Sequence, residues 1–233
     1  MQATSTLYQT ILADPGHHKE VKVVIAGVEY TQRNLISVRT SGGLFQSVGI
    51  GNAAAREINM ELLPLGEIPR QAKIEVFVRL VLGELSSEWL PKGQFFFSTR
   101  QKDQVSGVLT VKGFDAMLKA ERPFADILTG AEDFPMVPAT AVDLISAAMG
   151  VEVDGRTVLS PAFQVHYPVD QEGDMTMREV LCRLAVANAG NWIITDAGRL
   201  LLVPLNSIPS EADSFLVTET GAYITFGGIR IKV

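Results

Sequence analysis

One stretch decides the fold, residues 89–121: WLPKGQFFFSTRQKDQVSGVLTVKGFDAMLKAE. Side chains alternate between the two faces of a β-strand, so Phe95 and Phe97 are predicted on one face and Phe96 on the other. A strand with large apolar side chains on both faces needs cover on both. One face is therefore predicted to join the core and the other to contact a second subunit, which makes Phe95, Phe96 and Phe97 candidate subunit-interface residues.

The remainder of this stretch predicts a turn, a second strand and a helix. Residues 100–103, Arg-Gln-Lys-Asp, form a charged turn, and apolar and polar side chains alternate again over residues 105–112. Asp115 is placed to cap a helix that contains Met117 and Leu118. None of these elements carries a catalytic motif, and the pattern is typical of a building block of an assembly.

Further strands are predicted upstream of this stretch. Residues 57–63 alternate Ile58, Met60 and Leu62 with polar side chains, as a half-buried strand does. The predicted strands cover residues 21–31, 35–39, 57–63, 73–82, 94–99 and 105–112. Short strands with short connections are typical of an antiparallel barrel or sandwich, which is the fold class predicted for this part of the chain.

After about residue 113 the pattern becomes helical. Thr140 is predicted to cap a helix over residues 141–149, which Gly150 ends. Short strands are predicted at residues 151–153 and 163–167. Three of the eleven prolines fall within residues 122–138, which predicts an extended connector.

A second helix and a hairpin follow. Thr176 and Glu179 form a capping box that starts a helix running to about Asn188, with Gly190 closing it. Residues 191–204 predict a hairpin around Asp-Ala-Gly at positions 196–198. The fold class is therefore mainly β with an α+β part: an antiparallel β-barrel or sandwich followed by a small α+β module.

Composition limits the classes of function. The chain has 233 residues, of which 47% are hydrophobic and 20% charged, as in an ordinary globular protein. Its net charge of −6 argues against a surface that coats nucleic acid. Solubility alone is the simplest interpretation of this acidic charge.

The single cysteine and the N-terminal residues predict neither a disulfide nor a signal peptide. Cys182 has no partner for an intrachain disulfide. The N-terminal residues contain neither a basic region nor a long apolar run, so we expect no signal peptide. No stretch reaches the roughly 18 apolar residues that a membrane span needs, so no membrane insertion is expected.

Three segments resemble the hub family of phage tails and related contractile injection machines. The first is Trp-Leu-Pro-x-Gly-x-Phe at residues 89–95 with Gly-Phe-Asp-Ala-Met-Leu at residues 113–118. The second is Thr-x-Arg-Glu-Val-Leu at residues 176–181 with Asp-x-Gly-x-Leu at residues 196–200. The third is the Gly-rich turn leading into a strand at residues 45–62. Together the matches span most of residues 20–205, and their order along the chain supports the resemblance.

The resemblance implies a structural role at the end of a tail tube. Hub subunits of this family form a trimeric ring that joins the tail tube to the spike, so the implied partners are two further copies, a tail tube protein and a spike protein. It implies a tube-like β-barrel domain over residues 1–120 and an α+β module over residues 121–205. Residues 206–233 return to the barrel or begin a second tube-like domain, so the chain is a shortened hub or part of a longer one.

Several residues are of types that occur in nucleotide, metal or catalytic sites. Gly49 and Gly51 are better explained by a turn with positive φ than by a dinucleotide site, because a strand follows them. His17 and His18 are adjacent and make a poor metal chelate. A thiol triad of His166, Asp170 and Cys182 has no supporting motif. No catalytic, cofactor-binding or metal-binding residue is predicted.

Two other classes of protein stay open beside the hub. The first is a tail-associated cell-wall hydrolase fragment, because paired carboxylates about 5–10 Å apart can cleave glycosidic bonds. Its candidate acids, which are better explained as a solvated face, are Glu57, Glu61, Glu132, Asp133, Asp170, Glu172 and Asp174. The second is a free-standing β-rich binding module. The preferred hypothesis is a non-enzymatic virion subunit, assembled in the host cytoplasm.

Overall fold

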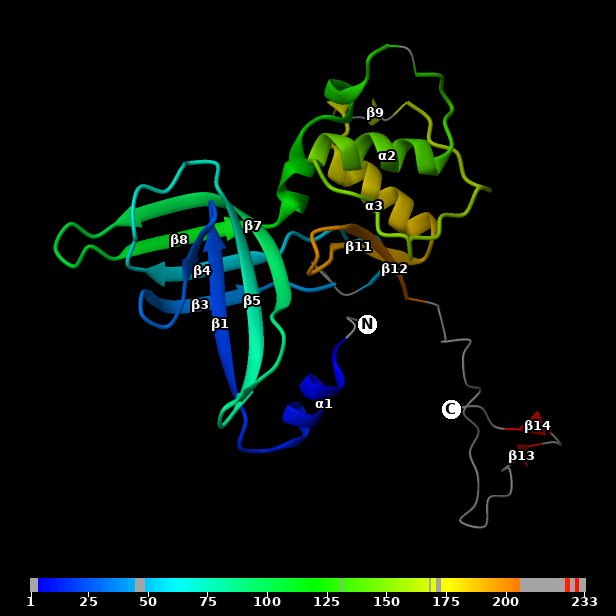
Figure 1. The fold of residues 1–233 in the computed structure, drawn as a ribbon. Helices are drawn as coiled ribbons and strands as arrows, with labels where there is room; N and C mark the ends of the chain where they lie inside the picture. Colours follow the sequence, from blue (N-terminus) through cyan, green and yellow to red (C-terminus); the bar gives the residue numbers. More distant parts are fainter. Residues whose placement is uncertain are drawn as a thin grey trace.

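The first half of the chain forms one antiparallel sheet that curls into a half-barrel (Figure 1). The structure is a computed structural model and describes residues 4–44, 49–130, 132–167, 169–170, 173–205, 225–226 and 229–230. The sheet has eight strands in the order β2-β1-β5-β7-β8-β4-β3, with β6 paired to β5. Its strands are β1 His18–Ile25, β2 Val28–Tyr30, β3 Leu35–Ser41, β4 Glu57–Leu62, β5 Lys73–Leu82, β6 Leu85–Ser86, β7 Leu90–Lys102 and β8 Leu109–Phe114. The predicted fold class is confirmed.

Alternation along the strands builds the core of the half-barrel. In β4, Ile58, Met60 and Leu62 are buried, whereas Asn59 and Glu61 are exposed. The other buried members of this core come from neighbouring strands and from the loop between β4 and β5; they are Val23, Ile25, Tyr30, Ile68, Ala72, Ile74, Val76, Phe95, Leu109 and Val111. The alternation of apolar and polar residues therefore places the apolar side chains on the concave face of the sheet.

Strand β7 turns the corner of the sheet. It pairs with β5 up to Phe96 and with β8 from Phe96 onward, with register shifts between Val76 and Phe77 and between Phe97 and Thr99. Bulges of this kind bend a strand and increase its twist. In Figure 1, β1 and β5 accordingly run across the direction of β3, β4 and β8.

The predicted turn at residues 100–103 is wrong. Strand β7 continues to Lys102, which pairs with Leu109, and the turn lies at residues 103–107. There the Gly107 N–H donates to the Asp103 carbonyl across 2.9 Å. The charged side chains at residues 100–102 are exposed, so their polarity marks the solvent face of a projecting hairpin and not the end of a strand.

The second half of the described chain packs two helices on a hairpin (Figure 1). Its elements are the 3₁₀ helices η1 Ala116–Glu121 and η2 Phe124–Ile127, the helices α2 Pro138–Met149 and α3 Met177–Ala187, and the strands β11 Gly190–Ile194 and β12 Leu200–Pro204. Trp192, Ile194, Leu200 and Leu202 bury one face of the hairpin in a core that also holds Ile145 and Leu181. These residues form the α+β module.

The helix ends differ in part from the prediction. Asp115 caps η1 as predicted, by accepting from the Met117 N–H, although the helix is of the tighter 3₁₀ type. The capping box of Thr176 and Glu179 is confirmed at α3. Helix α2, however, begins at Pro138 and not after Thr140, because proline suits the first turn of a helix, where its missing N–H is not needed.

The predicted closure of α3 by Gly190 is also wrong. Asn188 is the C-terminal cap, Ala189 takes the positive φ of 48°, and Gly190 already belongs to β11. A Cβ at position 190 would lie 2.7 Å from the Val203 carbonyl oxygen, so the glycine permits close strand pairing. Gly150 ends α2 with φ 69°, as predicted.

Several short segments complete the described chain. Helix α1 (Thr6–Ala13) contacts β5, and β9 (Val169–Asp170) pairs with β10 (Gly173–Asp174). The strands predicted at residues 151–153 and 163–167 are only single bridges, Val153 to Leu200 and Val165 to Met136. Strands β13 (Thr225–Phe226) and β14 (Ile229–Arg230) pair with each other, and the rest of the predicted segment 206–233 lies outside the described residues.

The core of the α+β module includes residues that precede residue 121 in the sequence. Ala116, Met117 and Ala120 of η1 belong to the core of the α+β module, as does Ala53, which precedes β4. The core of the α+β module therefore contains one residue from before β4 and three from η1, which follows β8. The division into a domain over residues 1–120 and a module over residues 121–205 stays a prediction.

Candidate functional site

Arg56 joins the half-barrel to the α+β module. It lies directly before β4, and its guanidinium donates to the Asp196 carboxylate across 2.7 Å and to the Lys92 carbonyl across 2.6 Å. The Asp196 carboxylate also lies 3.7 Å from the Lys92 ammonium. The guanidinium carbon lies 5.5 Å from the centre of the Phe95 ring. Arg56 thus connects β7 with the turn of the β11–β12 hairpin.

A buried carboxylate lies behind the Arg56 backbone. Asp115 accepts from the N–H groups of Arg56 and Met117 across 3.1 and 3.0 Å, and its own N–H donates to the Arg56 carbonyl. Asp115 is 2% exposed. Burial raises its pKa to about 6, against the lowering effect of those hydrogen bonds and of the charges of Arg56 and Arg178. This carboxylate therefore ties the end of β8 to the start of β4 at the junction.

Further contacts fix the hairpin against the half-barrel. The Asn191 side chain accepts from the Asn52 N–H across 2.8 Å and donates to the Gly49 carbonyl across 3.0 Å. At the hairpin turn Gly198 has φ 80°, and a Cβ there would lie 2.6 Å from the Gln94 side-chain oxygen. The turn of Gly49 and Gly51, with φ 136° and 87°, confirms the structural interpretation of those glycines.

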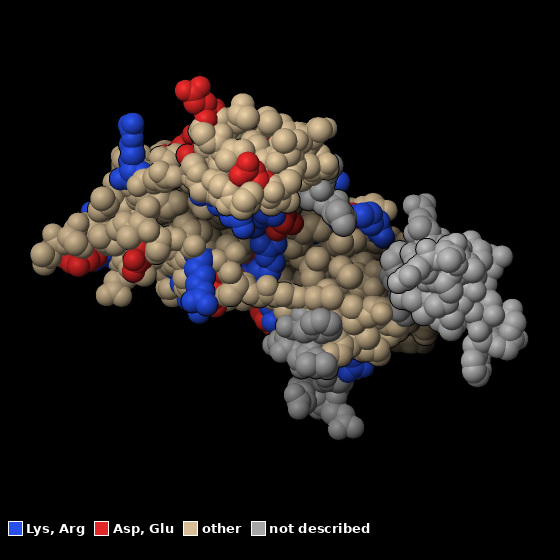
Figure 2. Space-filling view, turned by 90° about the horizontal axis from the view of Figure 1, so that it is seen from below, with Lys and Arg blue, Asp and Glu red and all other residues tan. Residues whose placement is uncertain are grey.

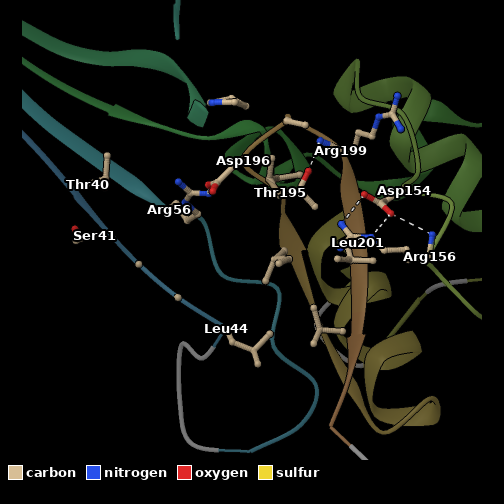
Figure 3. A pocket seen from close by; sticks show the side chains of 17 residues that line it. Thr40, Ser41, Leu44, Arg56, Asp154, Arg156, Thr195, Asp196, Arg199 and Leu201 are labelled. Atoms are coloured by element: carbon tan, nitrogen blue, oxygen red, sulfur yellow. Dashed lines mark hydrogen bonds and ion pairs between the residues drawn. The ribbon is translucent and has the colours of Figure 1, made fainter. Parts of the chain in front are cut away.

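A groove of about 900 Å³ opens beside this junction (Figure 3). One wall is the end of β3 and the residues after it, Thr40 to Leu44. The opposite wall is the β11–β12 hairpin, with Ile193, Leu201 and Val203 among its lining residues. Figure 2 shows one face of the molecule, where basic and acidic side chains gather near the middle and most of the surrounding surface is uncharged.

Three arginines line the groove. Figure 3 shows Arg56 directed at Asp196, and Arg156 and Arg199 lying near Asp154. Arg156 donates to Asp154 across 2.8 Å, and this hydrogen bond holds the pKa of Asp154 at about 2. The side chains of Arg156 and Arg199 are 56% and 51% exposed, so both reach solvent at the groove rim. Arg199 pairs with the Glu152 carboxylate across 3.2 Å, so each of the three arginines already has a carboxylate partner.

The three predicted interface phenylalanines lie in different surroundings. Phe95 is fully buried in the core of the half-barrel, as expected for the face of the strand that joins the core, and its place in a subunit interface stays a prediction. Phe97 is half-buried against the same core, and Phe96 packs against the core of the α+β module with the Lys119 ammonium 3.8 Å from its ring centre. The predicted alternation of faces is confirmed. A contact of Phe96 or Phe97 with another subunit stays a prediction.

Cys182, His166 and His17 do not form a reactive cluster within the described part of the chain. Burial raises the pKa of the Cys182 thiol, which disfavours the reactive thiolate. His166 is exposed, and the His17 ring contacts the Asp14 carbonyl. Among the described residues no group of His, Cys, Asp and Glu has the arrangement of a metal site.

Among the seven candidate acids, Glu57 and Glu132 bind nearby groups. Glu57 pairs with Lys112 across 2.9 Å, and Glu132 accepts from the N–H groups of Thr129 and Gly130. Glu61, Asp133 and Asp174 are exposed. The side chains of Asp170 and Glu172 lie outside the described structure. In the described part of the chain, no helix combines the length and apolar character of a bilayer span.

Sequence reasoning missed the groove and the role of Arg56. Arg56 and Asp196 lie 140 positions apart, and neither stands in a local motif that links them. The Asp-x-Gly segment at residues 196–198 was recognised only as a hairpin turn. No signal in a single sequence points to their contact.

The solved structures that are similar to this chain include tail proteins. The 43 kDa tail protein of prophage MuSo2 from Shewanella oneidensis is 14% identical, with a TM-score of 0.51, covering 81% of this chain and 56% of that one. A tail protein from Neisseria meningitidis MC58 is 12% identical, with a TM-score of 0.47, covering 79% of this chain and 51% of that one. Prophage tail protein gp18 from Listeria monocytogenes EGD-e is 10% identical, with a TM-score of 0.48, covering 88% of this chain and 56% of that one.

These likenesses concern the fold. This chain forms a curled antiparallel half-barrel with an α+β module, and its fold is similar to that of the Shewanella tail protein over 81% of the chain. The chain spans about half the length of the solved structures it matches, between 51% and 56%. No protein-family model matches the chain, and no curated protein matches its sequence.

Proposed function

We propose that this chain is a structural subunit of a phage tail or of a related tail-like particle. The observation that carries the proposal is the fold shared with the Shewanella prophage tail protein over 81% of this chain. Two of the three segments that resemble the hub family lie wholly within the described structure: residues 89–118 form β7, β8 and the start of η1, and residues 176–200 form α3, β11 and the turn into β12. Fold and motif order thus favour the same class of protein.

The finer proposal is a baseplate hub that joins the tail tube to the spike. In this role three copies form a ring, with a tail tube protein on one side and a spike protein on the other. The half-barrel supplies the ring, because its terminal strand β3 has a strand partner on one side only within the described chain. A strand edge of this kind accepts a strand from a neighbouring subunit. Cyclic symmetry then closes the assembly.

The role is non-enzymatic and needs no cofactor. The work of such a subunit is the burial of surface between copies, on the order of 2,000 Å² or more per interface. Assembly takes place in the host cytoplasm, and DNA passes through the lumen without stable binding, in keeping with the net charge of −6. No membrane insertion is involved.

The test is the solution mass of the purified chain, measured by light scattering over a concentration series. The expected result is a trimer, with a threefold ring in negative-stain images. A chain that stays monomeric both alone and when mixed with the tube protein encoded in the same tail gene cluster would contradict the hub proposal. A monomer that trimerises only with that tube protein would support it.

A further inference from the structure

The groove beside the junction presents apolar side chains to an occupant. In the β11–β12 hairpin, Ile193, Leu201 and Val203 line the groove, because the residues that alternate with them point into the core of the α+β module. Leu44 lies on the other wall (Figure 3). The three arginines of the groove all have carboxylate partners within the chain. An occupant therefore gains most by burying an apolar side chain against these walls.

The β7–β8 hairpin carries an apolar side chain at its tip. The hairpin projects beyond the rest of the sheet (Figure 1), and Val105 at its turn is 98% exposed. The turn is held by its own hydrogen bonds: the Asp103 carboxylate accepts from the Val105 N–H across 2.8 Å, and the Asp103 carbonyl accepts from the Gly107 N–H across 2.9 Å. Because the turn is ordered before any contact is made, little conformational entropy is lost when it binds.

The hairpin tip and the groove lie at opposite ends of the sheet. In β8, β4 and β3 the end next to the tip carries Leu109, Leu62 and Leu35, which lie in register. Ser41, which lines the groove, lies at the other end of β3. Strand β8 spans six residues, so the two ends lie roughly 17 Å apart. The hairpin of one chain therefore points away from its own groove, and a second copy is needed to bring the two surfaces together.

We propose that the tip of the β7–β8 hairpin, residues 103–107, inserts into the groove of a second copy, where Val105 packs on Ile193 and Val203. The contact is head-to-tail, since tip and groove are different surfaces, and such contacts form a ring when the rotation between copies closes. The outer edge of β3, assigned above to a neighbouring copy, borders the groove at Ser41, so one neighbour occupies both. The inference rests on the proposed function for the closure of that ring.

Disulfide trapping tests the contact on the full chain. In a Cys182→Ser background, one protein carries Val105→Cys and a second carries Val203→Cys, and the two are mixed and oxidised with copper phenanthroline. A disulfide needs Cβ atoms about 3.5–4.5 Å apart, so a covalent heterodimer, identified by the mass of its linked peptides, is expected only if the tip enters the groove. Ile193→Cys supplies a second groove position. Leu85→Cys, at an exposed position outside the groove, is the control and is expected to give no heterodimer.

Light scattering separates this inference from the proposed function. Val105→Asp sets a charge against the apolar wall and is expected to weaken self-association about tenfold or more, whereas Leu85→Asp leaves it unchanged. A trimer that forms without either groove disulfide, that Val105→Asp leaves intact, or that traps Leu85→Cys equally well overturns the inference and keeps the hub. A chain that stays monomeric with and without the tube protein and yields no groove disulfide overturns both. Groove disulfides in a chain that forms no trimer support the head-to-tail contact and contradict the hub.

Discussion

The guanidinium of Arg56 donates to the Asp196 carboxylate across 2.7 Å and so connects residues 140 positions apart. The two side chains are 19% and 34% exposed, which places the pair between a surface and a buried salt bridge. Removing one partner of a buried pair costs more than removing a surface pair, because the remaining charge loses its counterion. The pair therefore stabilises the contact between the hairpin turn and the sheet.

Arg56→Ala is expected to lower the free energy of unfolding by about 2–3 kcal/mol. The change removes the Asp196 pair, the hydrogen bond to the Lys92 carbonyl and the contact with the Phe95 ring. Asp196→Ala should cost less, about 1 kcal/mol. Urea unfolding of both single variants and the double variant measures their coupling. Lys73→Ala, which breaks an exposed pair with Glu75, serves as control; additive effects of the two main changes would contradict a direct interaction.

Asp115 is expected to make stability depend on pH. Its folded-state pKa is raised from 3.8 to about 6 by burial. Because the folded state holds this proton more tightly than the unfolded chain, its stabilisation is present below about pH 4 and is lost as the pH rises through about 6. The loss is roughly 3 kcal/mol.

Urea unfolding between pH 4 and 7 measures this effect. Asp115→Asn removes the titrating group, so the fall in stability with rising pH should be smaller than in the original chain. Asp133→Asn changes an exposed carboxylate and keeps the original pH dependence. Identical pH profiles for Asp115→Asn and the original chain would contradict the assignment.

Gly198→Ala is expected to destabilise the hairpin contact. Position 198 has φ 80°, and the added Cβ would lie 2.6 Å from the Gln94 side-chain oxygen. Gly27→Ala is a matched control, since Gly27 has φ 83° with no atom within 4 Å of its added Cβ. Thermal unfolding should show a loss of about 1 kcal/mol for the control and a larger loss at position 198. Gln94→Ala should recover the excess; equal losses at both glycines would show that Gln94 moves aside freely.

Phe95→Ala and Phe97→Ala are expected to separate folding from assembly. Phe95 is fully buried, so its truncation should cost about 3–5 kcal/mol in the free energy of unfolding. Phe97 is half-buried, so its truncation should cost less in the monomer. If Phe97 contacts another subunit, Phe97→Ala should also weaken the trimer, measured by light scattering. An unchanged association constant would remove Phe97 from the predicted interface.

Local patterns in the sequence predicted much of the fold because they act over a few residues. The alternation of Ile58, Met60 and Leu62 and the capping box of Thr176 and Glu179 are both confirmed. The prediction failed where the same local sequence is compatible with two structures. The polar residues 100–102 suit a turn or the solvent face of a strand, and only pairing with β8 selects the strand.

The sequence by itself determined a mainly β fold, an antiparallel barrel or sandwich followed by a small α+β module, and it placed Phe95 and Phe97 on the face opposite Phe96. Side-chain periodicity and helix caps are short-range properties, so they can be read along the chain. Only the tertiary structure decided that Arg56 meets Asp196, that Asp115 is buried behind it, and that β3 faces the β11–β12 hairpin across a groove. These contacts join residues far apart in sequence, and they depend on how the sheet curls and where the hairpin packs.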